Sequence, residues 1–234
     1  MKKFFILLPA ILVASVCSAQ TLDEIMNKYY AANGSEILEK ATTLYVEAKA
    51  SQMGMEIPMT INVKKPNKVK MTMSVQGMDI VTAFDGEKGY MINPMTGSAE
   101  PTELPADQLS GVQQYNMFRD NVMESFKAGR VKLDGVEDVN GKPAYKLSVT
   151  DEAGKVTGAF IDKESFLAVK TTSTVEQMGQ VMEVESYMKE YMDVNGAKFP
   201  KVITQMVNGM DMGGITFEKV EMDKVIDDSI FKLK

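Results

Sequence analysis

Apolar and polar residues alternate with a period of two along most of the chain. Met55, Ile57, Met59, Ile61 and Val63, for example, are separated by Glu, Pro, Thr and Asn residues. This alternation is typical of strands that bury one face. The pattern predicts eleven or twelve strands, at about 43–50, 55–63, 69–75, 78–84, 88–93, 130–139, 142–150, 155–162, 166–177, 181–192, 199–208 and 211–222.

Helical spacing interrupts this alternation. Thr21 and Glu24 form a capping-box pair that predicts a helix over residues 22–33, with a second short helix near 36–41. Ser110 and Gln113 form a similar pair ahead of a predicted helix over 111–127. Its apolar stripe consists of Val112, Tyr115, Phe118, Val122 and Phe126.

Turn signals between the strands indicate hairpins and therefore an antiparallel sheet. They are Asp85-Gly86, Asn140-Gly141, Asn195-Gly196 and Asn208-Gly209. The alternation changes parity near Gly213-Gly214, where we expect a β-bulge. No internal repeat or linker is visible, so residues 20–234 are predicted to form a single domain.

A sheet of this width must curl, because a flat one would leave long edges and an uncovered apolar face. A closed barrel of that many strands is too wide for side chains alone to fill. The predicted helices at 22–33 and 111–127 can cover the opening. The expected fold is mainly β with helices (α+β): an incomplete antiparallel β-barrel of about 11–12 strands with a helical lid.

Residues 1–19 have the order of an export signal. Lys2 and Lys3 precede an apolar run over 4–16, and Ser18 and Ala19 suit cleavage before Gln20. The alternative is a lipoprotein signal in which Cys17 is acylated. Val16 is bulky where that signal needs a small residue, which favours soluble export to the periplasm over a lipid anchor on Cys17.

The composition of the chain excludes several kinds of catalytic and metal-binding site. The chain has no His, no Trp and one Cys, which excludes His-based catalytic triads and His-ligated metal centres. The acidic pair Asp227-Asp228 lacks the spacing of a calcium loop, and acidic residues in turns are usually solvated. We therefore expect no enzymatic activity, no catalytic residues, no metal and no cofactor.

The charge balance is acidic. Removing residues 1–19 removes two Lys and no acidic residue, which leaves 24 basic and 32 acidic side chains. An excess of negative charge argues against nucleic acid and against adhesion to anionic lipid. We expect a monomer that does not bind nucleic acid.

Methionine is unusually frequent: residues 20–234 contain 19 Met but only 9 Leu. Even spacing along the predicted strands places many of these side chains on one face. Two explanations remain open, a deformable cavity for apolar ligands and an ordinary core that uses Met freely. The first predicts a cavity lined by Met59, Ile61, Met71, Met73, Met182 and Met188, with Tyr115, Phe118 and Val122 under the lid.

Three segments resemble the periplasmic outer-membrane lipoprotein carrier family, which has the LolA/LolB-like fold. They are Lys64-Lys65-Pro66-Asn67-Lys68-Val69-Lys70-Met71, then Phe84-Asp85-Gly86-Glu87-Lys88-Gly89-Tyr90-Met91-Ile92-Asn93-Pro94-Met95-Thr96-Gly97, and finally Ile226-Asp227-Asp228-Ser229-Ile230-Phe231. The resemblance implies an incomplete barrel that binds lipoprotein acyl chains, or another lipid, and carries them across the periplasm without catalysis. It also implies an inner-membrane exporter and an outer-membrane acceptor as partners.

The sequence departs from this family in one respect. Family carriers hold the lid with an arginine on an early strand, whereas the only arginines here are Arg119, on the predicted lid helix, and Arg130. Arg119 is therefore the candidate lid latch. The alternative function is an envelope structural, interaction or sensor module that uses the same fold without lipid transport.

Overall fold

The computed structural model describes residues 20–52, 54–113, 115–177 and 179–233. The predicted export signal at 1–19, including Cys17, lies outside the described residues. Thirteen strands form one antiparallel sheet. They are β1 (Thr43–Gln52), β2 (Met55–Lys64), β3 (Lys68–Val75), β4 (Met78–Phe84), β5 (Gly89–Asn93), β6 (Ser98–Glu103), β7 (Val131–Val139), β8 (Lys142–Thr150), β9 (Val156–Asp162), β10 (Ala168–Gln177), β11 (Gln180–Val194), β12 (Ala197–Val207) and β13 (Met210–Met222).

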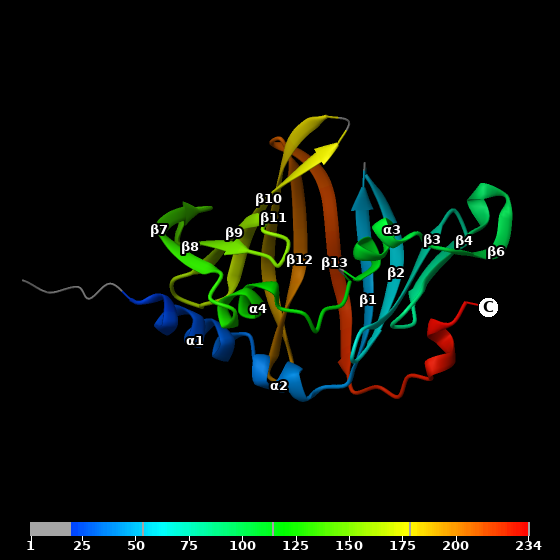
Figure 1. Ribbon diagram of the computed structural model, residues 1–234, viewed down its shortest axis with the longest axis horizontal. Coiled ribbons are helices and arrows are strands. Elements are labelled where there is room, and N and C mark those ends of the chain that lie inside the picture. The colour runs from blue at the N-terminus through cyan, green and yellow to red at the C-terminus, as the bar shows by residue number, and fades with distance from the viewer. Residues whose placement is uncertain (1–19, 53, 114, 178, 234) are drawn as a thin grey trace, which may run out of the picture.

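The sheet is a meander whose first and last strands meet in the middle. Its order is β6-β5-β4-β3-β2-β1-β13-β12-β11-β10-β9-β8-β7, with β6 and β7 at the two edges. We call strands β1–β6 the first arm and strands β7–β13 the second arm. The sheet is strongly curved but not closed (Figure 1), so the predicted incomplete barrel is confirmed.

Helices α1–α4 cover one face of the sheet. They are α1 (Leu22–Ala32), α2 (Ser35–Lys40), α3 (Ala106–Gln113) and α4 (Asn121–Lys127). The 3₁₀ helix η1 (Pro94–Thr96) lies in the β5–β6 connection, and the 3₁₀ helix η2 (Asp228–Phe231) contacts the other face of the first arm through Lys64 and Lys68. α1 and α2 run beneath the second arm, and the C-terminal segment leaves β13 in the opposite direction, beneath the first arm (Figure 1). Every helix in the described part of the chain is too short or too polar to traverse a bilayer.

The covered face carries two apolar clusters. In the first arm, Leu44, Ile61 and Val69 are fully buried and pack with residues of α2 and α3. In the second arm, Leu147 and Ile161 pack with residues of α1 and α4. Thr21 caps α1 through the predicted capping box with Glu24, which sets where the first helix begins.

The turn and bulge predictions are confirmed. Asn140, Asn195 and Asn208 have φ between 49° and 54°, and the glycine after each also has positive φ. These are the conformations that two-residue hairpin turns require. The register between β12 and β13 shifts as Gln205 pairs with Gly213 and Met206 with Asp211, so the bulge lies at the predicted place.

Strand β6 was not predicted, because Pro101 and Pro105 marked residues 98–110 as irregular. The structure contains thirteen strands, one more than the largest number expected. β6 pairs only with β5 and forms an edge of the sheet. Proline is tolerated on an edge strand because one side of that strand makes no ladder hydrogen bonds.

The prediction of one continuous helix over 111–127 is wrong. α3 ends at Gln113, and α4 begins at Asn121 after residues 115–120. Asp120 has extended backbone angles (φ −111°, ψ 92°), and its carboxylate accepts hydrogen bonds from the Val122 and Met123 amides. A side chain that caps a new helix in this way competes with continuing the previous one.

The C-terminal segment joins two of the motifs that carry the family resemblance. The Asp227 side chain caps η2, and the ammonium groups of Lys64 and Lys68 lie 2.6 Å and 2.9 Å from the Asp228 carboxylate. The two lysines hold the pKa of Asp228 at about 2. The acidic pair therefore fastens the segment to β2 and β3, and Phe231 behind it is completely buried.

We expect Phe231→Ala to lower the free energy of unfolding by about 3–5 kcal/mol, because it removes a fully buried aromatic side chain. Urea unfolding followed by circular dichroism measures the change. Val225→Ala is the matched control in the same segment, since Val225 is 98% exposed and should change stability by less than about 0.5 kcal/mol. Equal effects of the two substitutions would show that the segment is not anchored through Phe231.

Candidate functional site

A large cavity lies between the covered face of the second arm and the N-terminal helices. It has a volume of about 950 Å³, within the usual range of about 300–1,000 Å³ for small-molecule sites. Strands β8–β12 form its floor. Its roof consists of residues 117–120 and α4, and α1 and α2 close one side.

Roof and floor face each other with apolar side chains. Met117, Phe118, Val122 and Met123 belong to the roof, so two of the three predicted lid residues line the cavity. The floor contributes small and large apolar residues from successive strands. These are Val149 of β8, Ala159 of β9, Ala168 of β10 and Phe199 of β12.

A polar group of two tyrosines and one carboxylate crosses this cavity. Tyr29, Asp120 and Tyr191 all line it. Burial raises the pKa of all three groups, and the Tyr29 hydroxyl hydrogen-bonds to Asp120. The Tyr191 hydroxyl donates to the Ala168 carbonyl at 2.6 Å. Since Asp120 also caps α4, its carboxylate accepts hydrogen bonds that position the roof.

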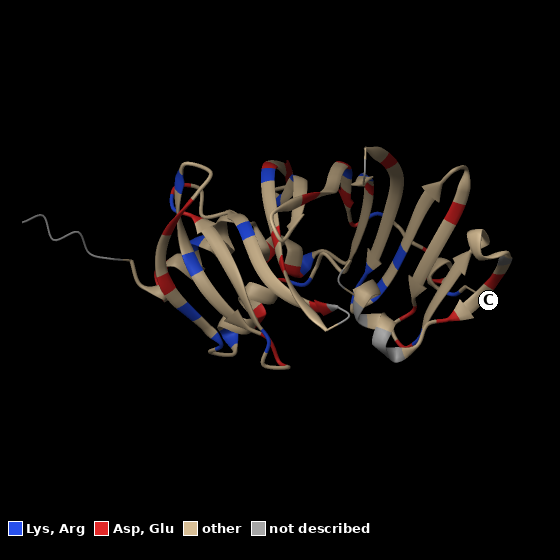
Figure 2. Ribbon diagram, turned by 90° about the horizontal axis from the view of Figure 1, so that it is seen from above, with Lys and Arg blue, Asp and Glu red and all other residues tan. Residues whose placement is uncertain are grey.

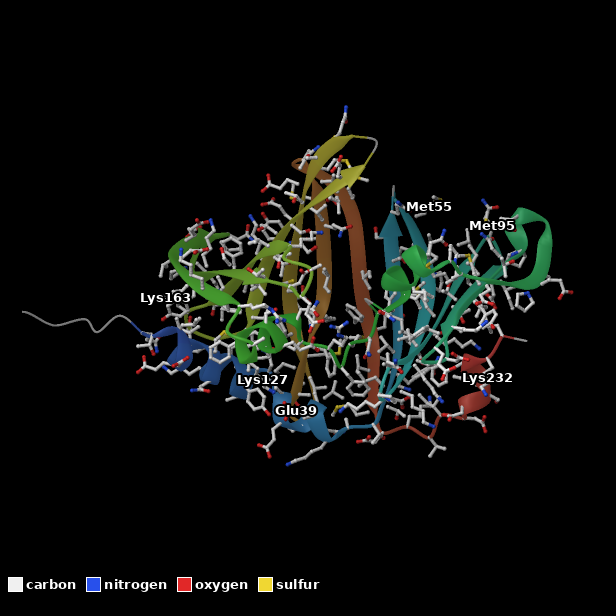
Figure 3. The ribbon with its side chains drawn as sticks, viewed as in Figure 1. Glu39, Met55, Met95, Lys127, Lys163 and Lys232 are labelled. Carbon is white, nitrogen blue, oxygen red and sulfur yellow. The ribbon has the colours of Figure 1, made fainter. Side chains whose placement is uncertain are left out.

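An ion pair joins the roof to the side of the cavity. The Lys127 ammonium of α4 lies 3.1 Å from the Glu39 carboxylate of α2, which also accepts a 2.8 Å hydrogen bond from the Tyr30 hydroxyl of α1 (Figure 3). The hydrogen bond from Tyr30 contributes most to lowering the pKa of the Glu39 carboxyl group, and the contact with Lys127 lowers it further. We call Glu39, Tyr30 and Lys127 the α2–α4 latch.

Lys65 makes a second connection between α2 and the roof. Its ammonium donates to the Leu38 and Glu39 carbonyls at 2.7 Å each, at the C-terminal end of α2. It also lies 4.5 Å from the centre of the Phe118 ring, a cation–π distance. Burial lowers the pKa of this ammonium group. One lysine from the β2–β3 turn therefore contacts both the side and the roof of the cavity.

Arg119, the candidate lid latch, lies in the roof and lines the cavity. Its guanidinium pairs with Glu124 of the adjacent α4 at 2.9 Å, so this ion pair stays within the roof. The roof is connected to its surroundings by Lys127 and Lys65, in addition to the Tyr29–Asp120 hydrogen bond.

The predicted methionine lining lies elsewhere. Met59, Ile61 and Met71 face the covered side of the sheet, as their parity predicted, but they are buried in the first-arm core. Met73 packs against that core, and so does Tyr115, the third predicted lid residue. Since none of these side chains lines the large cavity, their role in ligand binding stays a prediction.

Met182 and Met188 are separated from this group. Met188 lines a second cavity of about 480 Å³ together with Val139, Leu167 and Val169. Met182 pairs with Val175 near the end of the β10–β11 hairpin and lines neither of the two cavities described here. The structure thus does not bring the six predicted lining residues together in one site.

Sequence reasoning missed the floor of the cavity. The inward parity of Val149 and Ala159 was visible in the strand pattern, but the predicted lining was chosen from the methionine positions, which lie on other strands.

In the described part of the chain, no group of three or more Cys, Asp or Glu side chains is arranged to hold a metal ion.

No family model and no curated protein matches the sequence. Solved structures match over nearly the whole chain. A LolA superfamily protein from Nitrosomonas europaea is 13% identical, with a TM-score of 0.59, over 92% of this chain and 98% of that one. An outer membrane lipoprotein-sorting protein domain from Vibrio parahaemolyticus, described as putative, is 10% identical, with a TM-score of 0.55, over 88% and 97%.

A DUF1329 family protein from Desulfovibrio piger is similar to the same extent, with 13% identity and a TM-score of 0.58 over 90% of this chain and 99% of that one. At such low identity the comparison shows the fold alone. The chain therefore has the fold of the LolA superfamily and of outer-membrane lipoprotein-sorting domains, as its three motifs indicated.

Proposed function

We propose that this protein is a non-catalytic carrier of the bacterial envelope that holds an acyl chain or a similar apolar ligand in the large cavity. The observation that carries the proposal is the cavity itself, about 950 Å³, to which both roof and floor contribute apolar side chains among polar and charged ones. The fold shared with lipoprotein-sorting domains favours lipoprotein acyl chains as the load. The partners would then be an inner-membrane exporter and an outer-membrane acceptor.

The energetics favour a roof that can open. Burying about fifteen methylenes at ~0.8 kcal/mol each gives roughly 12 kcal/mol before the costs of binding are subtracted. A carrier must release such a ligand, so the closed state cannot be strongly stabilised. The α2–α4 latch suits this requirement, because both Lys127 and Glu39 are more than half exposed and exposed ion pairs stabilise little.

The cavity is also not uniformly apolar. Besides Tyr29, Asp120 and Tyr191, its lining includes Thr157 and Thr171 on β9 and β10 and the charged residues Lys155 and Lys198. A ligand with an apolar chain and a hydrogen-bonding head group matches this combination better than a pure hydrocarbon does. This supports an acylated molecule over an unfunctionalised hydrocarbon.

Displacement of a fluorescent fatty acid by palmitate tests the carrier proposal. We expect saturable binding to the wild type and at least about tenfold weaker binding to Val122→Glu, because a charge on the roof disfavours the apolar chain. Val136→Glu is the control, since Val136 on β7 is already 51% exposed and lies outside this cavity. Absence of saturable binding, or equal weakening by both substitutions, would contradict the proposal.

The latch makes a prediction for ligand exchange. We expect Glu39→Ala to accelerate release of the fluorescent fatty acid in stopped-flow measurements, because it removes both contacts that α4 and Tyr30 make with Glu39. Glu36→Ala is the matched control, because Glu36 pairs with Lys40 within α2 and not with the roof. Identical release rates in the two variants would rule out a gating role for the latch.

The same latch predicts a pH dependence. The folded-state pKa of Glu39 is lowered, so the latch is fully formed above the ordinary Glu pKa of about 4.3 and is lost as the pH falls through the lowered value. We expect the wild-type release rate to stay constant from about pH 8 to pH 5 and to rise below about pH 4. Glu39→Ala should lack this rise, and a rise of equal size in that variant would assign it to another group.

A further inference from the structure

Apolar side chains are exposed at the tips of four neighbouring hairpins. In an antiparallel meander, alternate turns lie at the same end of the sheet, so the β1–β2, β3–β4, β10–β11 and β12–β13 hairpins point the same way, toward the top of Figure 1. Met55, labelled in Figure 3, is at one of these tips. We define the apolar rim as Met55, Met78, Val175, Val181, Met210 and Met212, whose exposed fractions lie between 37% and 70%.

Strand pairing places the β1–β2, β12–β13 and β10–β11 tips of this rim side by side. Ser51 of β1 pairs with Gly214 of β13, which places Met212 beside the end of β1, where Gln52 pairs with Met55. On the other side, β12 carries Val207, which pairs with Met210. Val207 also pairs with Val184 of β11, so the rim continues onto the β10–β11 hairpin. Single exposed apolar residues are ordinary, but six on adjacent tips form a patch.

The turns do not explain these residues. Asn208 and Gly209 have φ of 49° and 77°, and Gln76 and Gly77 have φ of 52° and 80°. Such turns depend on their two central residues. Met78 and Met210 follow them at positions that are 37% and 64% exposed, and the turn geometry does not require an apolar side chain there.

Carboxylates surround the apolar rim. Within the described parts of segments 50–57, 74–81, 174–184 and 205–214 there is no Lys or Arg. The exposed acidic residues beside the rim are Glu56, Asp79, Glu176, Glu183 and Asp211. Among the described side chains, only one cation lies within 4.0 Å of any of these five carboxylates, namely Lys49 at 3.9 Å from Glu56.

This charge pattern decides between the surfaces that could cover the rim. Five carboxylates, of which only Glu56 has a described cation within 4.0 Å, would repel an anionic bilayer surface. A second copy of this chain would present the same negative border and would be repelled as well. A protein with an apolar patch bordered by Lys and Arg is complementary in both respects.

We propose that the apolar rim docks a protein partner whose contact surface is apolar at its centre and basic at its border. Unbranched methionine side chains adapt to partner surfaces of different shape, which suits a contact that forms and dissociates. None of the rim residues lines the large cavity, so the inference stands on observations separate from those behind the carrier proposal.

A synthetic amphipathic helix of Leu and Lys is the first probe, with a Leu and Glu helix of equal length for comparison. We expect the basic peptide to bind in fluorescence anisotropy, less tightly as salt rises, and the acidic peptide not to bind. Met55→Ser with Met210→Ser keeps every charge and should weaken binding at least about tenfold. Val225→Ser, at a 98% exposed position on another segment, should leave it within about twofold.

Three outcomes of this experiment would overturn the inference. One is equal binding of the two peptides, and another is equal affinity of the rim variant and Val225→Ser. The third is tighter association of the rim with vesicles of phosphatidylethanolamine and phosphatidylglycerol than with the basic peptide. Fatty-acid displacement by the rim variant should match the wild type, so a failure of the docking inference is distinguishable from a failure of the carrier proposal.

Photo-crosslinking in the native envelope identifies the occupant. Benzoylphenylalanine at Met55 or Met210 should give one discrete protein adduct, and the crosslinked peptide should map to an apolar surface next to Lys or Arg. The same group at Val225 should not give that adduct. Adducts with phospholipid alone, with a second copy of this chain, or with the same protein from all three positions would refute the docking surface.

Discussion

The pairing of the first strand with the last is the constraint on which the rest of this structure depends. β1 and β13 run antiparallel from Leu44 opposite Met222 to Ser51 opposite Gly214. Hydrogen bonds reinforce the lower end of this seam, where Thr42 and Thr43 bond to Asp223 and to the Lys224 carbonyl. Without the seam, each arm would be a separate meander with an unpaired edge. With it, the two arms share one covered face.

The seam also decides which terminal segment covers which arm. The chain enters β1 and leaves β13 at the same end of these two central strands, and the two segments then diverge (Figure 1). α1 and α2 cover the second arm and leave the large cavity beneath α4. Residues of α2 and α3 fill the covered face of the first arm, where no comparable cavity is described, and the η2 segment packs on the other face of that arm, with Phe231 buried. Acidic and basic residues are interspersed along both arms when the molecule is seen from above (Figure 2). The two arms therefore differ in the elements that pack on them and not in their distribution of charge. This difference in packing makes the second arm the candidate binding site.

Local patterns predicted most of the sheet because its signals are local. Alternation located twelve of the strands, and Asn-Gly pairs such as Asn208-Gly209 located their turns. The break between α3 and α4 was missed because an apolar stripe runs through it, whereas the features that separate the helices are turns within 115–120 and the cap made by Asp120. The cavity was missed for a different reason. Its floor depends on small residues such as Ala159 and Ala168, and small residues leave space only when strands distant in sequence are aligned.

The seam also has a consequence for the order in which the protein can fold. Each arm consists of strands joined by short turns, so its contacts are local and can form early. The central pairing joins residues more than 160 positions apart, such as Ser51 and Gly214. Loop closure over such a distance is slow, and it requires the last strand to be present. During synthesis or export, the edge of β1 therefore stays unpaired until β13 is available. The chain is most vulnerable to aggregation at this stage.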